Sequence, residues 1–141
     1  MRIGVIIVSC LLWLWFLGCS FTWKFGKVLL VEGMGLKSIE FAALVLWTLG
    51  IIGYLLWESV GKWILLAELT LWLIVQFFSH EHFTIFDVSD RKLKGYNECF
   101  EGTVKLFPIS KTRLIPDLYH IVLHFLIVTD LTLVALLIFG S

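Results

Sequence analysis

Four long apolar segments, separated by polar stretches, set the pattern of this chain. They cover residues 3–22, 39–57, 63–78 and 116–139, and a polar segment at 79–113 lies between the last two. About 20 apolar residues, at ~1.5 Å of rise each, cross a hydrocarbon core about 30 Å thick. The pattern therefore predicts an all-α integral membrane protein, with residues 1–141 forming a single domain of four transmembrane helices.

Residues near the ends of these segments fit helix boundaries. Ser38 is suited to cap a helix that begins at residue 39, and Pro116 suits a first helical position, where its missing amide costs nothing. The link at 58–62 is short enough to predict an antiparallel hairpin of the second and third helices. Gly50 and Gly53 predict a face where a neighbouring helix packs closely.

The first apolar segment has two other interpretations. Met1–Arg2 is a weak charged start for a signal peptide, and Phe16–Cys19 only loosely resembles a lipoprotein processing box, because Phe16 stands where leucine is usual. Residues 3–22 contain no charge and are long enough to span a bilayer. We therefore expect a retained helix rather than cleavage or lipidation within residues 1–19.

The two longer polar stretches predict different structures. Residues 23–38 hold three lysines and three glycines, so we expect a loop with at most one turn in the headgroup layer. Residues 89–107 place apolar side chains at three- and four-residue steps, which predicts an amphipathic helix lying flat on the membrane surface. The alternative is a soluble loop that packs Tyr96 and Phe100 under the helices.

Composition supports a membrane protein. Sixty per cent of the residues are hydrophobic, 16% are charged and the mean hydropathy is +0.96, far more apolar than a soluble domain of this length. The zero net charge gives no bulk attraction to nucleic acid. The expected partners are the lipid bilayer and, because four helices enclose little volume, further copies of the chain or a larger membrane complex. The three cysteines have no metal-type spacing and do not resemble a disulfide framework.

The basic residues predict an orientation. Four crossings put both termini and the 58–62 link on one side, which carries Arg2 and Lys62. The other side carries nine basic residues: Lys24, Lys27, Lys37, Arg91, Lys92, Lys94, Lys105, Lys111 and Arg113. Because cytoplasmic loops are enriched in Lys and Arg, we expect both longer loops in the cytoplasm and both termini outside.

Two carboxylates lie inside the predicted spans. Glu68 would lie ~8 Å below the outer boundary and Asp130 ~9 Å below it, because the third and fourth helices run in opposite directions. A charge at the bilayer centre costs about 2.5–3.5 kcal/mol on insertion scales, so such residues are often functional. The pair predicts a proton or cation site. The alternative is that both carboxylates bind Thr70, Thr129 or Thr132 and only hold the helices together.

The histidines form a second candidate site. His120 and His124 are four residues apart and share a helical face with Asp117, while His80 and His82 follow the third apolar segment. All four would gather near the inner boundary, where a divalent metal ion such as zinc, or haem, would find suitable ligands. The alternative is that His80 and His82 are hydrated boundary residues, and that His120 and His124 form polar contacts between helices.

No enzyme motif accompanies these residues. Dinucleotide, phosphate-loop and hydrolase signatures are missing from the sequence, and Cys99 with a histidine base is a weak nucleophile pattern. The sequence therefore favours a non-enzymatic transport or regulatory subunit in which Glu68 and Asp130 handle a proton or cation. The alternative is a metal- or haem-dependent membrane protein, redox or hydrolytic, built on the four histidines.

Overall fold

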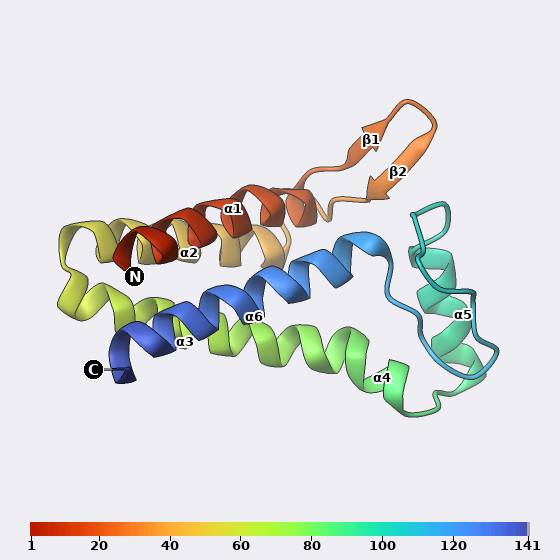
Figure 1. The fold of residues 1–141 in the computed structure, drawn as a ribbon. Helices are drawn as coiled ribbons and strands as arrows, with labels where there is room; N and C mark the ends of the chain where they lie inside the picture. The colour runs from red at the N-terminus through yellow and green to blue at the C-terminus, as the bar shows by residue number, and fades with distance from the viewer. Residues whose placement is uncertain (141) are drawn as a thin grey trace.

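The computed structural model describes residues 1–140 as a bundle of four long helices with a small lobe at one end (Figure 1). The long helices are α1 (Arg2–Ser20), α2 (Ile39–Leu56), α3 (Glu58–Gln76) and α6 (Leu118–Phe139). Helix α3 continues through a π-helical turn, η1 (Phe77–Glu81), and a last turn, α4 (His82–Ile85). The lobe contains a hairpin of β1 (Trp23–Phe25) and β2 (Val28–Val31), and helix α5 (Asp90–Cys99).

All four long helices are long and apolar enough to cross a membrane, with α3 counted through to Ile85. Large apolar side chains are exposed along each of them, among them Ile7, Leu46, Leu71 and Phe125. Such an apolar surface is unfavourable in water but matches hydrocarbon. The predicted set of four apolar helices is confirmed, and it is compatible with a membrane location.

The helices form a closed ring. Helix α1 packs against α2 and α6, and α3 packs against the same two helices from the opposite side. The core between them is made of fully buried side chains, including Leu12, Phe16, Leu69 and Ile127. Phe16 lies at its centre, with its ring edge-on to Trp72 at 4.9 Å between centroids. Close van der Waals packing of these side chains holds the four helices together, because in hydrocarbon their burial brings no hydrophobic gain.

The link between α2 and α3 is shorter than predicted. Helix α3 begins at Glu58, so only Trp57 separates the two helices and the expected connection at 58–62 is helical. Gly61 permits this, because a side chain there would collide with the backbone of Tyr54. The predicted helical hairpin is confirmed, but its connection lies inside α3.

The expected loop at 23–38 is also partly wrong, because residues 23–31 form an antiparallel β-hairpin. Gly26 supplies the turn with a φ of 62°, a conformation that favours glycine. Ladder hydrogen bonds satisfy the backbone, and Leu29 forms a bridge to Thr103 in the loop after α5. The apolar run at 28–31, too short for a membrane span, is long enough for a strand.

The surface helix is shorter than the apolar periodicity predicted. Helix α5 ends at Cys99, before Gly102, which has a φ of 79°. The later apolar residues Leu106 and Phe107 therefore lie in an irregular, exposed segment. Tyr96 and Phe100 contact the end of the bundle, as the alternative of a packed loop expected.

Both termini lie at the same end of the bundle as the α2–α3 junction, and the hairpin and α5 lie at the other end (Figure 1). At the end that holds the termini, Arg2 of α1 and Glu58 of α3 form an ion pair, with 3.1 Å between the charged groups. The ring of Trp63 also packs edge-on to Phe139 there. Both termini lie at one end because the chain has an even number of long helices and successive ones run in opposite directions.

Candidate functional site

The main polar cluster lies where η1 passes the first turns of α6. A π turn holds one residue more than an α turn, because its hydrogen bonds run from residue i to i+5. Here the consecutive residues His80 and Glu81 both contact α6. The His80 ring stacks on His120 with centroids 4.2 Å apart, and Glu81 Oε1 lies 3.1 Å from His124 Nδ1. Three of the four histidines thus come together along one interface.

Asp117 holds one member of the stacked pair in place. Its Oδ1 accepts the backbone N–H of His120 at 3.0 Å, which makes Asp117 the N-cap of α6. The same oxygen lies 2.6 Å from His120 Nδ1. Burial raises the pKa of Asp117, but the hydrogen bonds and charge of His120 outweigh burial and lower the pKa below its ordinary value. Asp117 is therefore a buried carboxylate that orients an imidazole.

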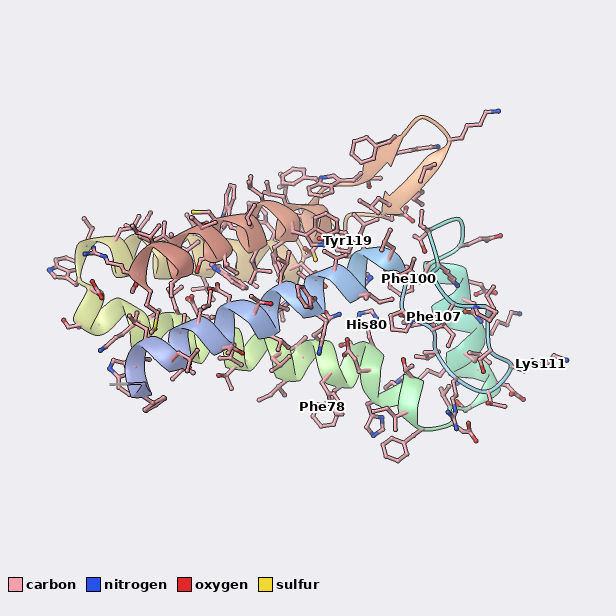
Figure 2. All side chains as sticks on the ribbon, in the orientation of Figure 1. Phe78, His80, Phe100, Phe107, Lys111 and Tyr119 are labelled. Atoms are coloured by element: carbon pink, nitrogen blue, oxygen red, sulfur yellow. The ribbon has the colours of Figure 1, made fainter. Side chains whose placement is uncertain are left out.

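Tyr96 and Phe100 hold the other member from the side of α5. The Tyr96 hydroxyl lies 2.7 Å from His80 Nδ1, and Phe100 packs edge-on to both His80 and His120 (Figure 2). Burial raises the pKa of Tyr96, so the phenol keeps its proton at neutral pH. A phenol that donates to Nδ1 leaves the proton of a neutral His80 on Nε2. Both stacked imidazoles thus use Nδ1 for their hydrogen bonds to other protein groups.

The fourth histidine lies apart from this cluster. His82 is surrounded by phenylalanine rings, with centroids 4.7 Å away at Phe83, 5.0 Å at Phe86 and 5.8 Å at Phe78. His82 therefore makes no ring contact with the other three imidazoles within residues 1–140. It lies two residues after His80, and side chains two residues apart on a helix do not face the same side.

The donor geometry does not fit the predicted metal or haem site. Across residues 1–140, no group of three or more His, Cys, Asp or Glu side chains is arranged to hold a metal ion. Axial haem ligation by two imidazoles would need their nitrogens to point at one iron from opposite sides. His80 and His120 instead lie face to face, with 29° between the ring planes.

A cavity of about 510 Å³ lies beside the stacked histidines, between the hairpin base, α5 and the helix ends. Its lining combines two carboxylates, two imidazoles, two thiols and a phenol, and contains no lysine or arginine. The lining residues are Cys19, Val31, Glu32, Gly33, Met34, Glu40, Ser79, His80, Tyr96, Cys99, Phe100 and His120. The cavity wall is therefore mainly apolar, with a few polar side chains whose formal charges are negative.

A reciprocal clamp between α1 and α6 supports one side of the cavity. The Tyr119 hydroxyl donates to the Trp15 carbonyl at 2.6 Å, and Trp15 Nε1 donates to the Tyr119 carbonyl at 3.1 Å. The two rings stack with centroids 5.3 Å apart. Cys19 Sγ lies 3.4 Å from the same hydroxyl. Cys19 in the cavity wall thus contacts Tyr119, the residue that precedes His120 in the sequence.

The two carboxylates within the long apolar helices have different partners. Asp130 is fully buried, and its Oδ2 accepts a hydrogen bond of 2.7 Å from Ser9 on α1. The Glu68 carboxylate instead fills the space that Gly50 leaves on α2. Each has one buried oxygen that makes no hydrogen bond within residues 1–140: Asp130 Oδ1 and Glu68 Oε2.

Glu68 and Asp130 are not bonded to each other in the part of the chain that the structure describes. The alternative of a threonine lock is wrong, because each of the three threonine hydroxyls donates to a carbonyl of its own helix, four residues earlier. A shared site for the two carboxylates remains a prediction. Gly50, expected to form a packing face, does so by accommodating Glu68.

Sequence reasoning missed Ser9 and the acidic part of the cavity wall. Ser9 is a polar residue within an apolar segment, and that was an available signal for a partner to Asp130. Glu32 and Glu40 carried no comparable signal. They reach the cavity because residues after the hairpin fold back, with Met34 N–H donating to Cys19 O at 2.8 Å.

No family model, curated protein or solved structure matches this chain. The class of protein therefore follows from geometry alone. It is a four-helix bundle of membrane-spanning length with an acidic cavity at one end.

Proposed function

We propose that this is a non-enzymatic multi-pass membrane protein that binds a small organic cation, such as an amine or quaternary ammonium ion, in the cavity at the loop end of the bundle. One observation carries the proposal. The lining contains Glu32 and Glu40 but no lysine or arginine. Carboxylates without basic partners in a cavity favour a positively charged ligand.

The other lining groups suit the same ligand. Tyr96 and Phe100 supply aromatic rings, which attract cations through their negative faces. His120 uses Nδ1 in its hydrogen bond with the Asp117 carboxylate, so Nε2 of a neutral ring is an acceptor for an ammonium N–H. A volume of about 510 Å³ lies within the range of small-molecule sites.

The test is calorimetric titration of the full chain in nanodiscs with tetraethylammonium and with hexylamine. We expect Glu32→Gln combined with Glu40→Gln to weaken binding about tenfold, or ~1.4 kcal/mol, because the variant loses both formal charges of the cavity. Glu101→Gln is the control, since Glu101 is exposed and outside the lining. The proposal is contradicted if the wild type and both variants bind with equal affinity, or if the wild type does not bind either ligand.

Orientation and assembly are parts of the proposal. Nine lysines and arginines near the cavity end support a cytoplasmic cavity, with both termini outside. On α6, buried Leu123 and Ile127 lie between His120 and Asp130 in the sequence and leave no polar path along that face. Translocation would therefore need further copies or a larger membrane partner, whereas a regulatory subunit would need only binding.

A second candidate function is proton handling by Asp130. It is favoured by a carboxyl group that is fully buried and has one oxygen without a partner. Burial disfavours the charged form, so such a group readily carries a proton. Proton flux into liposomes should fall in Asp130→Asn and persist in Val134→Ala, a buried control on the same helix. Flux unchanged by Asp130→Asn would remove this candidate.

A further inference from the structure

The tip of the hairpin is amphipathic. Phe25 and Val28 are cross-strand partners, so their side chains lie on the same face of the two-stranded ribbon. They are 68% and 50% exposed, although both are large apolar groups. Lys24 pairs with Leu29 on the opposite face, and Lys27 lies in the turn. An exposed apolar pair therefore stands between two lysines.

The base of the hairpin is firmly attached to the end of α1. Gly35 N–H donates to Ser20 O at 3.1 Å, and Gly33 N–H donates to Thr22 Oγ1 at 3.0 Å. The Trp23 ring packs edge-on to Trp15 at 5.7 Å. From this base the ribbon projects away from the bundle, starting at the level where α1 ends (Figure 1). The base of the hairpin therefore lies next to the end of a candidate membrane span, and the tip projects from this fixed base (Figure 1).

The charge of this tip is unbalanced. Lys24 and Lys27 are exposed and form no ion pair within residues 1–140, and residues 21–31 contain no carboxylate. Lysines near apolar side chains at a span end are suited to a bilayer surface, because the stems lie along apolar groups while the ammonium groups reach lipid phosphates. Phe25 and Val28 would be shielded from water by the same surface.

We propose that the hairpin tip docks on the anionic phospholipid headgroups of the leaflet around the end of α1. In this position, Lys24 and Lys27 bind the lipid phosphates and headgroup charges, and Phe25 and Val28 enter the boundary between headgroups and acyl chains. The partner is a lipid surface of negative charge. This inference is independent of the ligand proposed for the cavity, since Lys24, Phe25, Lys27 and Val28 are not part of its lining.

Native mass spectrometry of the full chain in a neutral detergent tests the proposal, with phosphatidylglycerol and phosphatidylcholine as the titrated lipids. The wild type should bind phosphatidylglycerol more tightly. Lys24→Gln with Lys27→Gln should lower that preference by about fivefold per lysine, the effect expected for a basic side chain near an anionic surface. Lys24→Arg with Lys27→Arg keeps both charges and should keep the preference.

The matched control removes the same charge elsewhere at this end of the chain. Arg91→Gln with Lys111→Gln changes two exposed basic residues outside the hairpin and should leave most of the preference intact. The proposal is overturned if this control loses as much preference as the hairpin variant. It is also overturned if the wild type shows no preference for phosphatidylglycerol. Unchanged helical circular dichroism in each variant excludes unfolding as the cause.

Discussion

At the scale of single residues, the Glu68 carboxylate of α3 occupies the space beside Gly50 of α2. A Cβ at residue 50 would collide with the Glu68 carboxylate. Gly50→Ala should therefore displace the end of the flexible Glu68 side chain and destabilise the bundle by about 1 kcal/mol, the low end of the usual cost of overpacking. Thermal unfolding in detergent measures this loss.

A second variant shows whether the carboxylate is the cause. In a Glu68→Ala background the added methyl group finds space, so Gly50→Ala should cost much less than in the wild type. Gly95→Ala is the control, because Gly95 faces open space in α5 and alanine is the better helix former. An equal cost of Gly50→Ala in both backgrounds would show that the collision is not with Glu68.

Asp117 makes stability depend on pH. Its folded pKa is lower than its unfolded pKa, which is about 3.9. The stabilisation is fully present above the unfolded pKa and is lost as the pH falls through the folded pKa. Unfolding temperatures measured from pH 6 to pH 3 should drop less steeply in Asp117→Asn, which retains a capping oxygen without the titrating group. A parallel drop in both proteins would assign the acid sensitivity to other groups.

At the scale of elements, η1 determines which side chains face α6. Deleting Ser79, an exposed residue, would convert the π turn to an α turn and shift His80 out of the stack with His120. We expect helical content to persist while tetraethylammonium affinity falls at least tenfold. Ser79→Ala keeps the chain length and should retain binding within about twofold. Retained affinity in the deletion variant would show that the stacked pair does not shape the cavity.

At the scale of the whole molecule, the chain has two distinct ends, and Cys99 reports on one of them. Cys99 is exposed in α5, at the end where the hairpin also lies. In a variant with Cys10→Ser and Cys19→Ser, a membrane-impermeant maleimide should label Cys99 in intact cells only after the membrane is permeabilised. Labelling before permeabilisation would reverse the proposed orientation.

Much of the fold could be predicted from the sequence because it depends on local chemistry. An apolar run of span length forms a helix in which every backbone group is paired, and Ser38 marks a helix start as predicted. The prediction of Pro116 in the first helical position was wrong, because α6 begins at Leu118 and Asp117 is its N-cap. The hairpin of α2 and α3 followed from a short link. The positions of Glu68 and Asp130 inside apolar helices could also be read from the sequence. The sequence did not predict that Glu68 lies against Gly50 or that Asp130 binds Ser9.

The sequence by itself therefore determined the number of apolar helices and the residue types available for chemistry. Only the tertiary structure decided which of them meet. The packing of α6 against the π turn stacks His80 on His120, and the folded-back chain brings Glu32 and Glu40 into the cavity wall beside them. The physical reason is that helix formation depends on neighbours within a few residues, whereas these contacts join segments 40 or more residues apart and depend on how whole elements pack.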